Sequence, residues 1–211
     1  MGAACAPTTK KAKTHMSMLL FVGLILLNLL ISWWNAKVCG TYWSESKKLG
    51  GFVRVMMWCG VIQSAIGFSM ALVVVEVLGA AYLGYLSPEA ADAAFSLWYL
   101  AVIIPCIGTG LIITVHSWVV AWRTRSWGDA GIAAWNTFAS GSNIYNAANG
   151  GVSTALDKVG DLFKGNDNKQ AQLVIALVLL SLVGGVLITM WLVGVYDKRA
   201  RLELRGQAMP A

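Results

Sequence analysis

The chain has 211 residues, of which 57% are hydrophobic and only 12% are charged, and its formal net charge is +6. Globular proteins carry about 25% charged residues, and soluble domains rarely expose an apolar patch larger than a few hundred Å², so this composition excludes an ordinary soluble domain. The basic charge comes without a clustered face or a recognised nucleic-acid-binding fold, so we expect no nucleic-acid partner and instead anionic lipid headgroups around the basic side chains.

Residues 1–15 are polar and include three lysines, and they predict a disordered basic tail. The first apolar run follows at residues 16–36 and ends near Trp33 and Trp34, which are aromatic residues typical of a membrane interface. The apolar core of this run is longer than that of a signal peptide, and small residues do not follow it. We therefore interpret it as a retained transmembrane helix.

Four stretches of at least 21 residues lack Asp, Glu, Lys and Arg, and they fix the class of protein. In a helix, about 20 apolar residues cross the ~30 Å hydrocarbon core of a bilayer. Such runs form helices, because hydrocarbon offers no partner to an unpaired backbone group. The sequence predicts an all-α membrane protein with one membrane domain over residues 16–196. About four transmembrane helices are expected, over residues 16–36, 53–86, 93–122 and 170–196.

The second and third predicted spans form a tight antiparallel hairpin. Apolar character continues past Glu76 as far as Leu86, and the next helix begins at Ser87-Pro88-Glu89. Ser caps a helix, Pro suits the first helical position and an acidic residue suits the positive end of the helix dipole. Pro105, inside the third span, predicts a kink.

Residues 129–164 separate the third and fourth predicted spans, and they predict an amphipathic helical loop. Val152, Leu156, Val159 and Phe163 recur at helical spacing with charged residues between them. We expect helices that lie on the membrane or on a partner protein, or that pack on the protein's own bundle. Residues 197–211 form a basic C-terminal tail.

The positions of Lys and Arg do not select an orientation for four simple crossings. Cytoplasmic loops normally carry the excess of these residues, but the two sides would hold 7 and 9 of them. One alternative is that the first or last run enters the bilayer and returns on the same side, with Gly184-Gly185 as a bend. We expect both termini on the cytoplasmic side of a bacterial inner membrane.

Ionisable groups inside a bilayer are costly and are therefore candidates for function. Glu76 and His116 qualify. In an antiparallel hairpin Glu76 faces residues 104–106, and His116 lies about 18 Å from that level at 1.5 Å per residue, so the two cannot form a proton relay. Glu76 remains a candidate functional carboxylate.

Four polar side chains are predicted to share one depth, near the ends of their spans that face the first and third loops: Asn28, Gln63, His116 and Ser181. We predict that they form a polar layer in which at least two members lie within hydrogen-bond reach. Such a layer either joins helices, at about 0.6 kcal/mol per pair, or binds a solute or an ion.

The last span carries small residues at four-residue steps: Ser181, Gly185 and Thr189. Small side chains at this spacing let another helix approach closely, so the stripe predicts a helix-packing face.

No catalytic, phosphate-binding or metal-binding motif is evident, so we expect no enzyme activity, cofactor or metal. The leading hypothesis is a non-enzymatic integral membrane subunit or scaffold of a larger assembly of the secretion, conjugation or phage-encoded type. Its partners would be other membrane proteins or further copies of itself. One alternative is a small solute transporter or channel, which needs a continuous polar path. Another is a holin-like pore-forming protein, which the small size and basic ends favour.

Overall fold

The computed structural model describes residues 8–165 and 168–207, which are helical apart from short turns. Four of the helices are long and apolar enough to cross a membrane, namely α1, α3, α4 and α7. The prediction of an all-α, multi-pass membrane protein is therefore confirmed. The elements in order are α1 (Thr8–Thr41), α2 (Trp43–Ser46), α3 (Gly51–Tyr82), α4 (Pro88–Thr124), α5 (Trp127–Asn146), η1 (Ala147–Gly151), α6 (Val152–Lys164) and α7 (Asn168–Gln207).

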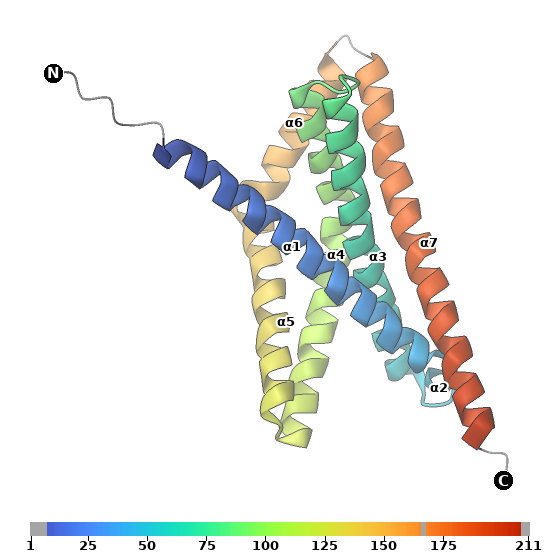
Figure 1. Ribbon diagram of the computed structural model, residues 1–211. Coiled ribbons are helices and arrows are strands. Elements are labelled where there is room, and N and C mark those ends of the chain that lie inside the picture. Colours follow the sequence, from blue (N-terminus) through green and yellow to red (C-terminus); the bar gives the residue numbers. More distant parts are fainter. Residues whose placement is uncertain (1–7, 166–167, 208–211) are drawn as a thin grey trace.

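Helix α3 is the centre of the bundle and packs against α1, α4 and α7 (Figure 1). The turn between α3 and α4 defines what we call the upper end of the bundle, and α2 with the turn between α4 and α5 defines the lower end. Ser87 caps α4 by accepting a hydrogen bond from the amide of Ala90 at 3.1 Å. The buried core is built from small and β-branched residues, among them Val73, Val77 and Val174.

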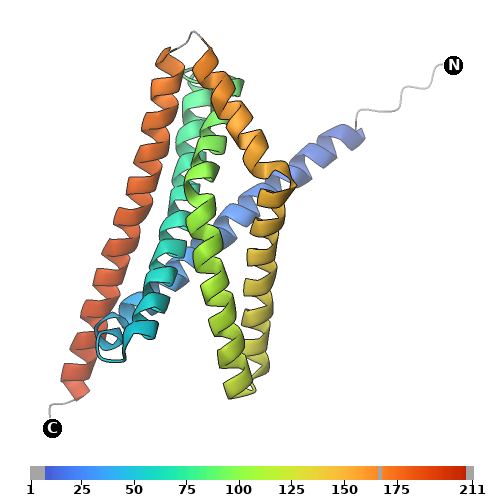
Figure 2. The ribbon, with the colours of Figure 1, turned by 180° about the vertical axis from the view of Figure 1, so that it is seen from behind.

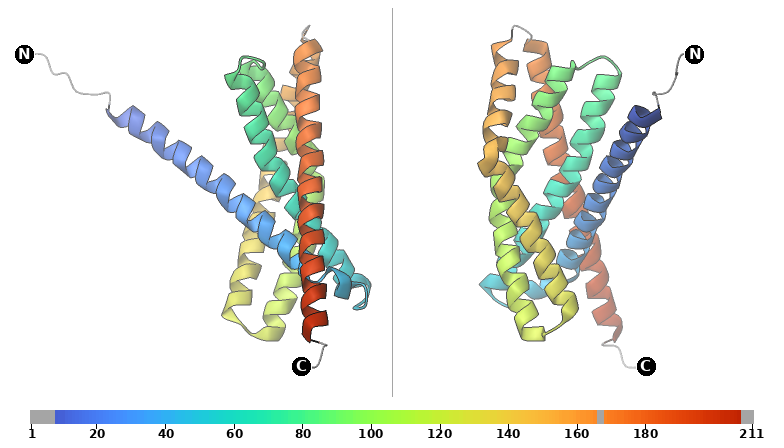
Figure 3. Two further views of the ribbon diagram at one scale, coloured as in Figure 1. Left: turned by 45° about the vertical axis from the view of Figure 1, so that its right-hand side comes forward. Right: turned by 90° about the vertical axis from the view of Figure 1, so that its left-hand side faces the viewer.

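Helix α1 packs on the bundle only through its C-terminal part and diverges from it toward its N-terminus (Figure 3). Ala36 is fully buried, whereas Leu24 and Leu26 are 55% and 60% exposed. The contact is close because glycines face it. A Cβ at Gly40 would lie 2.7 Å from the carbonyl oxygen of Val193 in α7.

Helix α5, the π-helical element η1 and helix α6 form one bent arm, residues 127–164, which lies beside α4 (Figure 2). We call it the α5–α6 arm. Three hydrogen bonds join the arm to α4: Thr137 bonds to Trp118, Ser140 to Thr114 and Lys158 to Asp92. The arm therefore runs antiparallel to α4 over most of its length. Of the alternatives expected for residues 129–164, the structure shows packing on the protein's own bundle.

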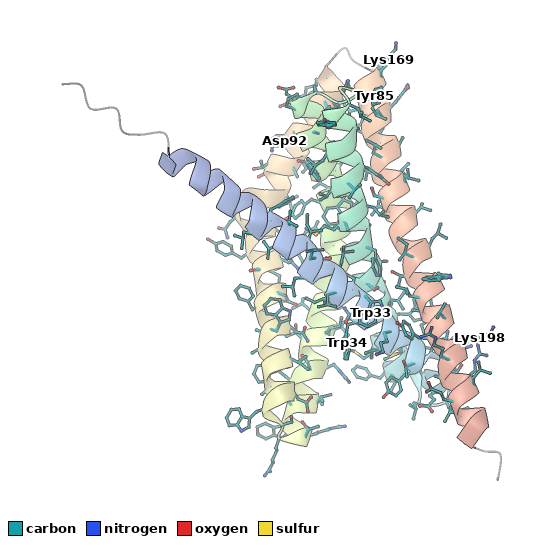
Figure 4. All side chains as sticks on the ribbon, in the orientation of Figure 1. Trp33, Trp34, Tyr85, Asp92, Lys169 and Lys198 are labelled. Carbon is teal, nitrogen blue, oxygen red and sulfur yellow. The ribbon has the colours of Figure 1, made fainter. Side chains whose placement is uncertain are left out.

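Helix α7 runs from the upper end to the lower end, parallel to α4 (Figure 4). Near its start, Gln170 donates a hydrogen bond to the carbonyl of Tyr85 in the upper turn, at 3.0 Å. Near its other end, the hydroxyl of Tyr196 accepts a hydrogen bond from the indole of Trp33 at 3.1 Å. Four simple crossings would make α7 antiparallel to α4, so that expected arrangement is wrong. The cause is the α5–α6 arm, which returns the chain to the upper end.

Two predicted tails continue neighbouring helices. Helix α1 begins at Thr8, so residues 8–15, predicted to be disordered, are helical, and residues 1–7 lie outside the described part. The basic residues after position 197 continue α7 as far as Gln207. Lys, Arg, Ala and Leu are good helix formers, and adding residues to an existing helix is easier than nucleating a new one.

Candidate functional site

A cavity of about 680 Å³ lies between α4 and the α5–α6 arm in the upper half of the bundle. We call it the arm pocket. Helix α4 contributes residues spaced three or four apart, which lie on one face of a helix. The arm contributes residues from both sides of its bend. The polar side chains that line the pocket are those of Asp92, Ser96, Tyr99, Tyr145, Asn146, Asn149, Thr154 and Lys158.

The bend of the arm shapes one wall of the pocket. Gly150 has φ +91°, a left-handed conformation that glycine adopts without a steric penalty, and Asn149 also leaves helical geometry. The side chain of Asn149 donates a hydrogen bond to the carbonyl of Tyr145 at 2.9 Å, and Ser153 donates one to the carbonyl of Gly150 at 3.0 Å. These two bonds tie polar side chains to backbone carbonyl groups on both sides of the bend.

An ion pair stands at the edge of the pocket. Lys158 Nζ lies 2.9 Å from Asp92 Oδ2, and the two side chains are 44% and 64% exposed. An exposed pair of this kind stabilises a protein by about 0–1 kcal/mol, so its charges remain accessible to a third polar group at little cost.

The hydroxyl of Tyr99 is buried against the bend. Among the described residues it has no hydrogen-bond partner, although it lies so close to Gly151 that a Cβ there would stand 3.1 Å from it. A buried hydroxyl without a partner costs about 1–3 kcal/mol. A molecule that entered the pocket and bonded to this hydroxyl would recover that cost.

The chemistry of the arm pocket suits binding of a small polar molecule. It offers amides and hydroxyls, one carboxylate, one ammonium group and the aromatic ring of Phe95. Across residues 8–165 and 168–207, no three His, Cys, Asp or Glu side chains are grouped so that they could hold a metal ion.

Sequence reasoning did not identify Asp92, Tyr99 or Lys158 as site residues, although one signal was present. Residues 130–156 contain no Asp, Glu, Lys or Arg, which makes them a fifth uncharged run. Their Asn, Ser and Gly residues lower the hydropathy and hide the run from a search for apolar segments.

Glu76 bonds to α7 and not to α4. Its Oε2 accepts a hydrogen bond from Ser181 Oγ at 2.8 Å. The prediction that Glu76 faces residues 104–106 is therefore wrong. The expected register was also wrong: Ser69 bonds to Trp98, and Gln63 bonds to Cys106 and Thr109, so Glu76 lies level with the start of α4. In addition, register does not fix the direction in which a side chain leaves the helix, and α3 has neighbours on several sides.

Gln63 connects α3 to α4 below the arm pocket. Its amide nitrogen donates hydrogen bonds to Thr109 Oγ1 at 2.7 Å and to the carbonyl of Cys106 at 3.0 Å. In the same region, the arm residue Asn143 donates to the sulfur of Cys106 at 3.3 Å. This contact network joins α3, α4 and α5.

The predicted polar layer of Asn28, Gln63, His116 and Ser181 is wrong, because these side chains lie at different depths. Asn28 lies beside Gly67 of α3, His116 beside Phe52 and Ser181 beside Glu76, whereas Gln63 belongs to α3 itself. Positions 52 and 76 are about 36 Å apart along a helix at 1.5 Å per residue. Ser181 was misplaced because α7 runs in the opposite direction to that assumed, which moves this residue into the upper half of the bundle.

The stripe of small residues on α7 faces α3. Ser181, Gly185 and Thr189 are all buried, and Thr189 Oγ1 lies 3.3 Å from Ser64 Oγ. A Cβ at Gly185 would lie 2.5 Å from the carbonyl oxygen of Ala65. The backbones of α3 and α7 therefore approach so closely at Gly185 that a larger residue would not fit.

Comparison of this chain with protein-family models, with curated proteins and with solved structures finds no match.

Proposed function

We propose that this protein is a non-enzymatic integral membrane subunit of a larger assembly in a bacterial inner membrane, and that α1 is its docking helix. The observation that carries the proposal is the exposure of α1 where it leaves the bundle. Leu20, Leu24 and Leu30 are 65%, 55% and 58% exposed. The remaining long helices, by contrast, contribute buried residues along most of their length.

Asn28 lies where α1 diverges from α3, and its side-chain oxygen faces Gly67, at which a Cβ would stand 2.7 Å from it. Its backbone carbonyl accepts a hydrogen bond from Ser32 Oγ at 2.8 Å, and its side-chain oxygen lies 3.4 Å from the same hydroxyl. Among the described side chains and backbone groups, none accepts a hydrogen bond from its amide nitrogen. Hydrocarbon supplies no acceptor either, and polar side chains join transmembrane helices by about 1–2 kcal/mol in model peptides.

The occupant that we infer for this face is α1 of a second copy. A carboxamide both donates and accepts hydrogen bonds, so two Asn28 side chains related by a two-fold axis would satisfy each other once each turns from Gly67 of its own α3 toward the second copy. The N-terminal part of α1 diverges from the bundle (Figure 3), and its exposed leucines leave it open to a neighbouring helix.

Crosslinking in native membranes tests the proposal. The wild-type protein should give a crosslinked dimer or a larger complex, Asn28→Leu should lower its yield several-fold, and Asn28→Gln should keep most of it because the carboxamide remains. Leu187→Ala, on an exposed face of α7, serves as the control and should have no effect. A monomeric wild-type protein that captures no partner contradicts the proposal, and so does equal crosslinking of Asn28→Leu and wild type.

The arm pocket favours a second candidate, a small solute transporter or channel. Interrupted transmembrane helices line the substrate sites of many transporters, and pockets of about 300–1,000 Å³ hold small ligands. Purified protein in liposomes should then carry one member of a panel of labelled amino acids and sugars, and Lys158→Met should reduce that flux. Unselective leakage would favour the holin-like alternative. The absence of any flux would count against both alternatives and would favour the subunit proposal.

A further inference from the structure

We propose that the α5–α6 arm crosses the membrane as a fifth transmembrane segment, and that the lower end of the bundle, with the C-terminal tail, faces the cytoplasm. The first reason is where the neighbouring helices end. His116, near the end of α4, lies against Phe52 at the start of α3, with ring centroids 5.8 Å apart, so α4 ends at the lower end. Gln170, near the start of α7, bonds to the upper turn. The chain between them must return through the full thickness of the bundle.

The second reason is the depth of the arm. It contacts α4 near the lower end through Thr137 and near the upper end through Lys158. Between these levels, Ser140 Oγ lies 3.0 Å from Thr114 Oγ1. Gly110 permits this approach, since a Cβ there would lie 2.9 Å from Ser140 Oγ. If α4 spans the bilayer, a helix that contacts it at each of these levels lies at the same depths.

The third reason is that the surface of the arm suits hydrocarbon. Ile132, Trp135 and Phe138 point away from α4 with 57%, 50% and 66% of their surface exposed. Two polar side chains of the arm, Ser140 and Asn143, face inward and bond to α4. The uncharged residues 130–156 would extend about 40 Å as a helix at 1.5 Å per residue, which exceeds the ~30 Å hydrocarbon core.

A fifth crossing also gives the basic residues a clear asymmetry. Ten of the 16 Lys and Arg residues then lie at or beyond the lower end, and cytoplasmic segments carry the excess of these residues. The ten are Lys37, Lys47, Lys48, Arg54, Arg123, Arg125, Lys198, Arg199, Arg201 and Arg205. The expectation of both termini in the cytoplasm is thereby replaced, because an odd number of crossings puts the two ends of the chain on opposite sides.

Cysteine labelling of the full-length chain tests the inference. In a background in which the four native cysteines are replaced by alanine, single cysteines are introduced as Leu83→Cys in the upper turn, Trp127→Cys at the lower turn and Gly165→Cys after α6. Leu83 and Trp127 are 66% and 94% exposed, and a Cβ at Gly165 meets neighbouring atoms no closer than 3.4 Å. Each variant is treated with a membrane-impermeant maleimide in intact and in permeabilised cells.

We expect cysteines 83 and 165 to react in intact cells and cysteine 127 to react only after permeabilisation. Equal accessibility of cysteines 127 and 165 would overturn the fifth crossing, because the arm would then begin and end on one side. The inverse pattern would keep the crossing and overturn the cytoplasmic assignment. If the cysteine-free background fails to accumulate, a protease-recognition sequence inserted at either end of the arm of the wild-type chain, after Arg125 in one variant and after Gly165 in another, makes the same distinction. Cleavage after Gly165 in intact cells and after Arg125 only in inverted vesicles supports the inference, whereas cleavage of both variants from the same side contradicts the crossing.

Discussion

At the scale of single residues, the bond between Glu76 and Ser181 shows how a carboxyl group is accommodated inside a membrane bundle. Glu76 is only partly exposed, and Ser181 is fully buried between α7 and α3. The hydroxyl oxygen also lies 2.9 Å from the carbonyl oxygen of Leu177, so its single proton is shared between that carbonyl and Glu76, and both contacts hold the hydroxyl beside Glu76. A partly buried hydrogen-bonded pair of this kind joins two helices without requiring that the carboxyl group take part in any reaction.

Glu76→Gln should therefore accumulate in membranes almost as well as the wild type, whereas Glu76→Lys should accumulate poorly. A glutamine oxygen still accepts the hydrogen bond from Ser181, but a lysine ammonium group cannot accept one and brings a charge toward the bundle interior. Immunoblotting of membrane fractions measures the effect. If the glutamine variant is lost to the same extent as the lysine variant, the negative charge itself is required.

Two glycines of α7 give a matched test of helix packing. Gly185→Leu should reduce the yield of folded protein strongly, because a side chain there meets the α3 backbone at Ala65 and Ser69. Gly194→Leu should have little effect, since no atom lies within 4 Å of a Cβ at that position. Monodispersity in detergent distinguishes the two variants. Equal losses would mean that the close approach of α7 to α3 is not what stabilises the bundle.

At the scale of elements, the α5–α6 arm depends on a bend that its sequence encodes locally. Gly150→Ala should destabilise the protein by about 1–2 kcal/mol, because an L-residue is strained in the left-handed conformation that this position adopts. Gly160→Ala, inside α6, is the control and should be neutral or slightly stabilising, since its Cβ would meet no atom within 4 Å. Thermal unfolding in detergent compares them. A Gly150→Ala variant as stable as Gly160→Ala would show that the bend is not fixed.

The elements also show which features the sequence predicts and which it does not. Apolar runs predicted the four long helices, and Ser87-Pro88 predicted the start of α4, because both signals are local. The return of the arm along α4 was not predicted because asparagines lower the hydropathy of the arm, although Asn143 is shielded by α4 in the folded chain. Hydropathy averages over a whole helix and takes no account of which face a polar residue occupies. This single omission reversed α7 and misplaced Ser181.

At the scale of the whole molecule, two parallel helices, α4 and α7, require a return path, and the arm is that path. This arrangement explains why Trp33 and Tyr196, more than 160 positions apart, meet at the lower end, and why the acidic residues Glu89 and Asp92 lie at the opposite end. It also places the arm pocket in the upper half of the bundle, where its ion pair lies between α4 and α6.

The most direct test of this account is disulfide formation between α4 and α5 in native membranes. Thr114 lies ten positions before the end of α4, about 15 Å inside the helix at 1.5 Å per residue, and its hydroxyl oxygen is 3.0 Å from that of Ser140. With the native cysteines replaced by alanine, Thr114→Cys combined with Ser140→Cys should form a disulfide in high yield under mild oxidation. Thr114→Cys combined with Phe138→Cys should not, because Phe138 points away from α4. Equally low yields from both pairs would show that α5 leaves α4 for the membrane surface, and the account would be contradicted.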